Sequence, residues 1–151
     1  MMGVTNDLWL HYDDLSKDQL YDLMSLRQQV FVVEQNCPYL DVDGDDQNAY
    51  HLLSYLDDNL IGYLRAFKGG IKYESPSIGR VVTNFTLRGA GHGRRLMRLG
   101  IARLRKMEPK KKIVISAQHR LKAFYEELNF YAVGDIYLED NIDHIEMHLD
   151  P

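Results

Sequence analysis

The segment from Ile78 to Met107 constrains the fold and chemistry of this chain more than any other. It begins with the apolar run Ile78 to Thr83, which is typical of a strand, and continues through the turn Arg88-Gly89-Ala90-Gly91-His92-Gly93 into a helical pattern. Glycines let a ligand approach the backbone closely, and the free N–H groups of a helix's first turn point toward an anion. This order of elements predicts a phosphate-binding site.

Three phosphate-binding patterns compete for this turn. The turn lacks the Lys-Ser/Thr ending of a nucleoside triphosphate loop, and its glycines have the wrong spacing for a dinucleotide fingerprint. The third pattern is Arg/Gln-x-x-Gly-x-Gly/Ala, which the chain matches as Arg88-x-x-Gly91-x-Gly93. A glycine turn of this length can also be a simple connection. With its strand and helix, however, it resembles the pyrophosphate-binding motif of the GCN5-related N-acetyltransferases (GNAT), which hold acetyl-coenzyme A there.

A second segment, Ile113 to Phe130, extends this resemblance. A buried-type strand leads into a helix that carries Phe124-Tyr125 and ends at Asn129-Phe130. The family pattern is a strand followed by Asn-x-x-Ala-x-x-Phe-Tyr-x-x-x-Gly-Phe, so Gln118 and Asn129 stand at its usual Asn and Gly positions. Both exchanges are mild, because Gln keeps the amide and Asn tolerates the left-handed conformation that ends helices.

Further motifs are similar to the ElaA-type subgroup of this superfamily. They are the run from Leu26 to Tyr39, the acidic loop Asp41 to Asp46, and the ending Glu139-Asp140-x-Ile142-x-His144, in which Asn141 and Asp143 depart from the usual residues. The resemblance covers nearly the whole chain. It implies one N-acetyltransferase domain over residues 1–151, with an α/β fold (α+β by some schemes) whose mixed, strongly twisted sheet is flanked by helices.

The apolar patterns give an element order of their own. A strand at Leu8 to Tyr12 precedes a helix that opens with the capping box Ser16-x-x-Gln19, and a hairpin follows at His51 to Phe67. After the two central segments, the stretches 133–138 and 144–149 are predicted to pair as the last strands. The predicted order is β-α-β-β-β-α-β-α-β-β.

Composition limits the remaining function classes. The chain has 151 residues, 45% apolar and 26% charged, as expected for one globular domain. It contains no run of eighteen apolar residues, so no membrane span is predicted. The single cysteine favours a cytoplasmic location. Ten of the eighteen Lys and Arg residues fall between Arg88 and Lys112, which suits a polyphosphorylated ligand, whereas the net charge of −4 and the lack of a nucleic-acid motif disfavour nucleic-acid binding.

The resemblance implies a set of cofactor-binding residues for acetyl-CoA. Backbone groups at Val81, Val82 and Thr83 are expected to hold the pantetheine arm and the thioester oxygen. Gln118 and Tyr125 are also expected to bind the cofactor, with Tyr125 near the sulfur. The expected pyrophosphate site is the turn itself, made of Arg88, Gly89, Ala90, Gly91, His92, Gly93 and Arg94.

Direct acetyl transfer to an amine also needs an acid and a base. Tyr125 is the candidate acid for the leaving thiolate, although its spacing from Leu121 also fits a core position. The candidate bases are Glu34, whose pKa burial could raise, and the histidines His51 and His144, with a water chain as the alternative. Cys37 lacks a local His–acid pair, so we expect a structural role and direct attack in a ternary complex.

The acceptor is the least defined part of the prediction. The acidic loop Asp41 to Asp46 lacks the glycine and glutamate positions of an EF-hand, so no metal is expected. Its expected roles are a turn and a negative rim that attracts a cationic amine, either a small molecule or a protein amine. A non-catalytic acyl-CoA sensor of the same fold is the rival function. The exposed last strands could also pair in a homodimer.

Overall fold

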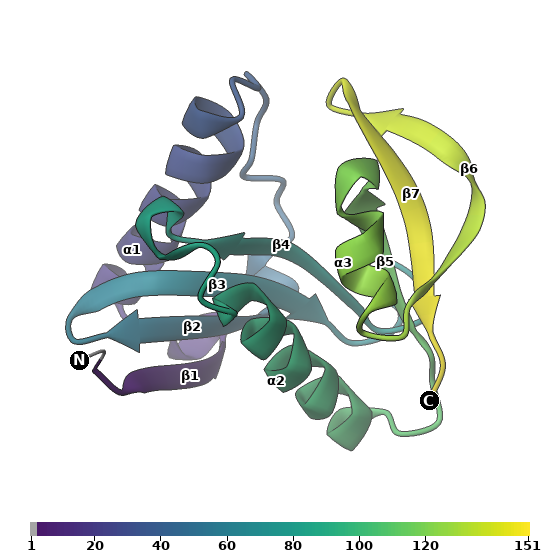
Figure 1. Cartoon of the computed structure of the whole chain (residues 1–151). Coiled ribbons are helices and arrows are strands. Elements are labelled where there is room, and N and C mark those ends of the chain that lie inside the picture. Colours follow the sequence, from purple (N-terminus) through teal and green to yellow (C-terminus); the bar gives the residue numbers. More distant parts are fainter. Residues whose placement is uncertain (1–2) are drawn as a thin grey trace.

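The computed structural model describes residues 3–151 and contains one seven-stranded sheet with helices on both faces (Figure 1). The strands are β1 (Thr5–His11), β2 (Tyr50–Leu56), β3 (Asn59–Phe67), β4 (Ser77–Thr83), β5 (Ile113–Gln118), β6 (Tyr131–Glu139) and β7 (Ile142–Leu149). The main helices are α1 (Lys17–Arg27), α2 (His92–Met107) and α3 (Lys122–Glu126). The predicted element order and the predicted fold class are therefore confirmed.

The first helix begins where its capping box predicts. The Ser16 hydroxyl accepts a hydrogen bond from the Gln19 N–H at 3.0 Å, and the Gln19 side chain accepts one from the Ser16 N–H at 2.8 Å. After Arg27 the helix widens into a π-helical segment, η2 (Gln28–Glu34). A π-helical stretch inside a helix is rare and is often found at functional sites. Here it carries the chain to the edge of the pocket described below.

Alternation along the strands assigns each helix to one face of the sheet. Leu52 packs with α2 and α3 in the larger hydrophobic core, while its neighbour Leu53 packs with α1 in the smaller one. Successive side chains of a strand point to opposite faces, so two apolar residues in succession are buried on both. Full burial of one such side chain contributes roughly 1.5–3 kcal/mol. The sheet is the middle of three layers, with α2 and α3 together on one face.

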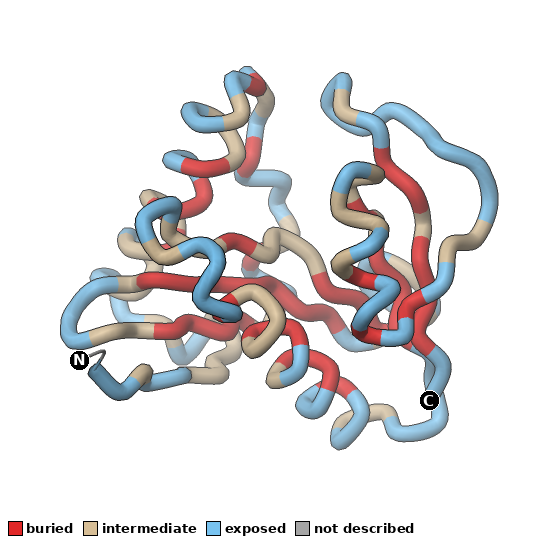
Figure 2. The backbone as a smooth tube through the Cα atoms, in the orientation of Figure 1, coloured by how far each residue is buried: buried red, intermediate tan, exposed pale blue. Residues whose placement is uncertain are grey.

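The order of the strands is β1-β2-β3-β4-β5-β7-β6, and only β4 and β5 are parallel. β6 is an edge strand, and most of its residues are exposed, as Figure 2 shows along the outer arch of the C-terminal hairpin. Pairing of this edge in a homodimer remains a prediction. Within the described residues, no helix is long and apolar enough to cross a membrane.

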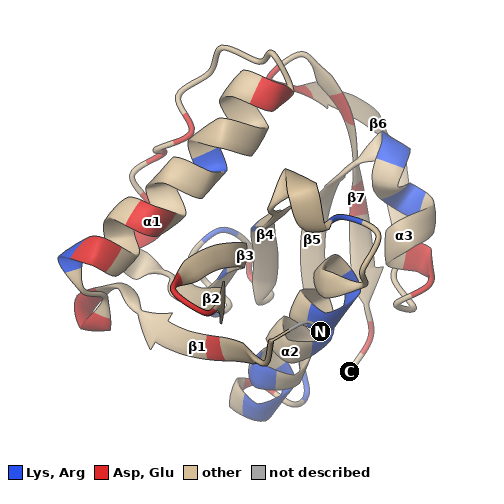
Figure 3. Cartoon of the chain, turned by 60° about the vertical axis from the view of Figure 1, so that its left-hand side comes forward, with Lys and Arg blue, Asp and Glu red and all other residues tan. Residues whose placement is uncertain are grey.

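Charge is unevenly distributed over the helices. Figure 3 shows Lys and Arg gathered along α2 and acidic residues along α1. The apolar face of α2 is buried and its charged residues lie outward. Its positive face follows directly after the glycine turn, as the sequence predicts.

Candidate active site

The parallel strands β4 and β5 meet only at their beginnings. Ser77 pairs with Val114, and the Val114 N–H donates to the Pro76 carbonyl at 2.9 Å. Beyond this point the two strands diverge (Figure 1). The β3–β4 register is also irregular between Tyr63 and Arg65, and Arg80 in β4 has a φ of 52°. The strand before the glycine turn therefore splays from its parallel neighbour.

A pocket of about 430 Å³ occupies the gap between the two strands. Its walls come from η2, the length of β4, the start of α2, the end of β5, α3 and the β6–β7 hairpin. Seven predicted cofactor residues line it: Val81, Val82, Thr83, Arg88, Gly93, Gln118 and Tyr125. Segments more than eighty residues apart in the sequence therefore form one cavity.

The glycine turn ends at the N-terminus of α2. Gly89 and Gly91 have φ angles of 88° and 82°, in the left-handed region that favours glycine, and Gly91 is the N-cap residue. No side chain caps this end of the helix, so the N–H groups of its first turn remain available for an anion. A Cβ built at Gly93 would lie 3.7 Å from the Phe124 ring, on the pocket side.

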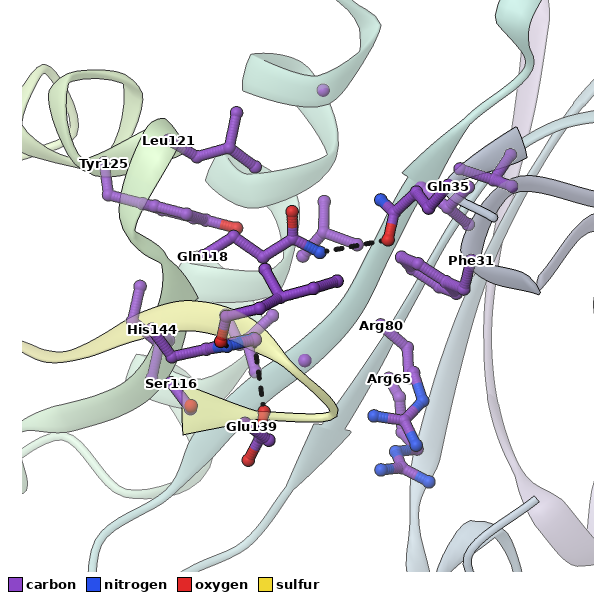
Figure 4. Close-up of a pocket in the computed structure, with 18 of the residues that line it drawn as sticks. Phe31, Gln35, Arg65, Arg80, Ser116, Gln118, Leu121, Tyr125, Glu139 and His144 are labelled. Carbon is purple, nitrogen blue, oxygen red and sulfur yellow. Dashed lines mark hydrogen bonds and ion pairs between the residues drawn. The ribbon is translucent and has the colours of Figure 1, made fainter. Parts of the chain in front are cut away.

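Two polar contacts connect η2 and the residue after it to the opposite wall of the pocket. Arg88 donates to the Glu34 carboxylate at 2.7 Å, and the Gln118 amide lies 3.3 Å from that of Gln35, as Figure 4 shows. The burial expected for Glu34 is wrong, because its side chain is 35% exposed. Glu34 lies in the pocket as a partner of Arg88, at the exposed end of η2.

Tyr125 belongs to both the core and the pocket. Its ring packs against Phe124 and Phe130 at centroid distances of 5.1 and 6.0 Å, and Figure 4 shows its hydroxyl directed toward Gln118. Burial raises the pKa of Tyr125 to about 12, although the charge of Arg120 opposes the increase. The phenol therefore stays protonated at neutral pH and can act as a proton donor.

His144 lies on the same wall, because its residue on β7 pairs with Gln118 on β5. Its Nδ1 is 2.7 Å from the Ile142 carbonyl, and its Nε2 is 3.2 Å from the Glu139 carboxylate. A carbonyl only accepts, so Nδ1 carries a proton and Nε2 is the nitrogen that can take up or release one in the pocket. The ring also stacks on Tyr137, whose hydroxyl is hydrogen-bonded to Ser116.

The family model described as an acetyltransferase (GNAT) domain matches residues 13–151. ElaA of Escherichia coli strain K12 is 42% identical over 140 residues, which cover 91% of this chain and 92% of that protein. The chain belongs to the GNAT family. Within GNAT it falls in the ElaA-type group, which the ending motif around His144 predicts.

Solved structures agree with this membership. The crystal structure of E. coli ElaA superposes with a TM-score of 0.90 at 39% identity, and an acyl-CoA N-acyltransferase from Pseudomonas aeruginosa with 0.91 at 38%. Each covers 96% of this chain and 99% of its own. An aminoglycoside 6'-N-acetyltransferase, solved with coenzyme A, has a TM-score of 0.68 at 16% identity over 95% of this chain and 96% of its own, and therefore shares the GNAT fold.

His51 is not part of the GNAT pocket, which corrects its prediction as a base. The side chain is fully buried, with Nδ1 2.6 Å from the Tyr63 hydroxyl and Nε2 2.9 Å from the Asp46 carbonyl. Burial lowers the pKa of His51, while its contact with Asp46 opposes the decrease. Both nitrogens have partners in the protein, so this histidine supports the structure.

The predicted role of the acidic loop as a free negative rim is also corrected, because its carboxylates are paired with arginines. Arg27, which is fully buried, donates to Asp41 at 2.8 Å and to Asp46 at 2.7 Å, and Arg65 donates to Asp43 and Asp46. Burial alone would raise the pKa of Asp46, but the hydrogen bond and charge of Arg27 outweigh burial and lower it. The loop is an ion-paired wall behind the pocket.

The other predicted turn residues lie outside the pocket lining. They are Gly89, Ala90, Gly91, His92 and Arg94. The side chain of His92 is buried, and its Nε2 has no hydrogen-bond partner among the described residues. Arg94 pairs with Glu127 on the surface. Binding of a ligand by these residues remains a prediction.

Sequence reasoning missed several pocket residues. Glu139 was part of a quoted motif without a role, yet the hairpin pairs it with Ile142 and brings it to His144. A carboxylate five residues before a histidine across a short turn is the signal that could have found it. Arg80 and Lys72 carried no such signal, because their neighbours come from the distant acidic loop. Cys37 is buried, and its thiol donates to the Asp140 carbonyl at 3.3 Å, which agrees with a structural role.

Proposed function

We propose that this protein is an N-acetyltransferase that transfers the acetyl group of acetyl-CoA to a primary amine by direct attack in a ternary complex. The observation that carries the proposal is the gap between β4 and β5, which joins the uncapped N-terminus of α2 to the hydroxyl of Tyr125 and the ring of His144. The solved aminoglycoside acetyltransferase with coenzyme A supports the choice of ligand for this fold.

The chain offers a place for each part of acetyl-CoA. The left-handed glycines and the free N–H groups of α2 fit a pyrophosphate, and Arg88 adds a cation at the same turn. The backbone of Val81, Val82 and Thr83 lies along the side of β4 that β5 leaves unpaired. Such free amides can bind an extended, amide-containing arm and polarise a carbonyl oxygen. Acetyl-CoA supplies the activated acyl group as a thioester.

Two residues on the β5–β7 side are proposed to move protons. His144 Nε2 takes the proton that the amine nitrogen loses as its bond to the acetyl carbon forms. Tyr125 gives a proton to the sulfur as the carbon–sulfur bond breaks. The substrate ammonium first releases one proton to solvent, and Glu139, 3.2 Å from Nε2, is placed to accept a hydrogen bond from the neutral amine beside the base. The products are the acetamide and free coenzyme A, and the proton on Nε2 returns to the Tyr125 phenolate, so charges and atoms balance.

Thermal unfolding with added ligands tests the proposal first. Acetyl-CoA or coenzyme A at a hundred times its dissociation constant should add about 2.7 kcal/mol, a shift of several degrees at this size. NADH and ATP serve as controls. Acetyl-dependent thiol release with an amine panel then tests turnover. Stabilisation without thiol release by any amine would indicate the rival function, an acyl-CoA sensor of the same fold.

His144→Gln tests the base. It should lower kcat by about 10²-fold, while the thermal shift caused by coenzyme A persists. An unchanged kcat would assign the proton to a water chain instead. A chain with one cysteine needs no oxidising compartment, which supports the cytoplasm as its location.

A further inference from the structure

Three cations line the pocket at the end remote from the glycine turn. They are Arg65, Lys72 and Arg80, and along β4 Arg80 comes before Val81 whereas the turn comes after Thr83. Their carboxylate partners are not pocket-lining residues: Asp41, Asp43, Asp45 and Asp46 all lie in the loop outside. The positive groups therefore face the cavity, and the negative groups stand behind them.

Ion pairing holds these cations in place without using all their donors. Arg80 Nε lies 2.8 Å from an Asp41 carboxylate oxygen without the geometry of a hydrogen bond. Its Nη2 donates to the Asp41 carbonyl at 3.0 Å and to Asp43 at 3.5 Å, whereas Nη1 has no partner among residues 3–151. Arg65 is 3% exposed, and its Nε likewise has no hydrogen-bond partner in the described chain. A guanidinium that carboxylates hold in place while one of its N–H groups stays free is preorganised to bind a further anion.

The wall of the pocket that faces these cations carries a negative charge, from Glu139. Figure 4 shows Arg65 and Arg80 on one side of the pocket and Glu139 and His144 on the other. A cationic amine would find Glu139 on one wall, but any second positive charge on the substrate would face Arg80 and Lys72. Repulsion of this kind discriminates against the wrong partner as effectively as attraction selects the right one.

We propose that the acceptor is a primary amine that carries an anionic group, a carboxylate or a phosphate. Its amine lies beside His144 and Glu139, and its anionic group binds Arg80 and Lys72. This inference rests on the proposed acetyltransferase function and names the substrate class. It replaces the cationic amine predicted from the acidic loop, because the carboxylates of that loop lie outside the pocket lining whereas Arg80 and Lys72 are part of it.

Matched amines test the proposal directly. We would compare β-alanine with β-alaninamide, and phosphoethanolamine with ethanolamine, by thiol release at saturating acetyl-CoA. The anionic member of at least one pair should have a kcat/KM at least tenfold higher. The two pairs separate a carboxylate site from a phosphate site. A preference for the partners that lack an anionic group, or for a diamine such as putrescine, would overturn the proposal.

Variants connect the preference to the two cations. Arg80→Gln and Lys72→Gln should each raise the KM of the preferred anionic amine at least tenfold more than that of its partner without the anionic group, and Arg80→Lys should restore part of the difference. Lys106→Gln, on the exposed face of α2 and outside the pocket, is the matched control and should leave the ratio unchanged. The coenzyme A thermal shift checks that each variant is folded. Lys72, at 33% exposure, can be replaced even if Arg80 proves essential for folding.

A failure of catalysis would be distinguishable from a failure of this inference. If no amine releases thiol, calorimetry on the protein loaded with coenzyme A would compare N-acetyl-β-alanine with N-acetyl-β-alaninamide, and O-phospho-N-acetylethanolamine with N-acetylethanolamine. Tighter binding of an anionic member, lost in Lys72→Gln, would support the anion site without turnover. Equal binding within both pairs would overturn it.

Discussion

Arg88 Nη1 lies 2.7 Å from Glu34 Oε2, so the residue that opens the glycine turn is held by a carboxylate at the end of η2. Both side chains are more than a third exposed, at 40% and 35%. Exposed pairs of this kind contribute about 0.2–1 kcal/mol. The pair connects the proposed pyrophosphate site to the opposite wall of the pocket.

Coenzyme A should compete with Glu34 for Arg88. Glu34→Gln removes the competing charge, and we expect it to lower the dissociation constant of coenzyme A about two- to fivefold, the range that an exposed pair allows. Arg88→Gln should weaken binding and flatten its dependence on salt. Calorimetry at two salt concentrations measures both. Weaker binding in Glu34→Gln would contradict the competition.

Removing the Tyr125 hydroxyl should separate chemistry from binding. Because burial raises the pKa of this phenol to about 12, it remains a proton donor at working pH, and Tyr125→Phe should lower kcat by about 10²-fold. The ring stays in the core, so the dissociation constant of coenzyme A should change less than twofold. Calorimetry and steady-state rates check this. A loss of binding equal to the loss of rate would assign Tyr125 to packing alone.

Two glycines offer a matched test of the turn. Gly91 and Gly134 both have left-handed φ angles, of 82° and 80°, and a Cβ at either would meet no atom within 4 Å. Alanine should therefore destabilise the protein at both positions by a similar amount, about 1–2 kcal/mol, from backbone strain. Only Gly91→Ala should also weaken coenzyme A binding. Urea unfolding measures the loss of stability, and thermal shifts with coenzyme A measure binding. Equal ligand shifts in the two variants would exclude the turn from the coenzyme A site.

The ion-paired loop predicts acid sensitivity. The pKa values of Asp43 and Asp46 are lowered below their unfolded value of about 4, because their arginine partners outweigh burial. Their contribution to stability is therefore present above pH 4 and is lost as the pH falls toward the folded values. The free energy of unfolding, measured in urea from pH 7 to pH 2, should fall below pH 4. Asp43→Asn should make the free energy of unfolding less dependent on pH below pH 4. The wild-type pH dependence in this variant would show that Asp43 does not cause the acid sensitivity.

The sequence predicted the elements well where one local signal decided them. Ser16 and Gln19 form the capping box, and Asn129 adopts the left-handed φ of 71° expected at the end of α3. The glycine turn between β4 and α2 also agrees with the prediction. These features depend on a few consecutive residues, or on a motif whose geometry a family shares.

The errors arose where distant residues decide the environment. His51 loses its proton-transfer role because Tyr63, twelve residues away on the paired strand, and the Asp46 carbonyl take both nitrogens. The charges of the acidic loop are cancelled by arginines fourteen to thirty-nine residues distant. A pattern of consecutive residues carries no information on such partners. The same limit hid Glu139 and Arg80, whose roles depend on which walls of the pocket they form.

An open sheet ordinarily has two edges, and over part of its length this one has four. Because β4 and β5 part after Ser77 and Val114, each exposes unpaired amides toward the other, in addition to the outer edges at β1 and β6. Unpaired edges invite strands from other molecules and lead to aggregation. The two inner edges face a cavity of about 430 Å³, which excludes a folded partner and admits an extended chain of one-strand width. The fold therefore keeps a row of hydrogen-bonding groups available to a slender ligand while withholding it from other proteins.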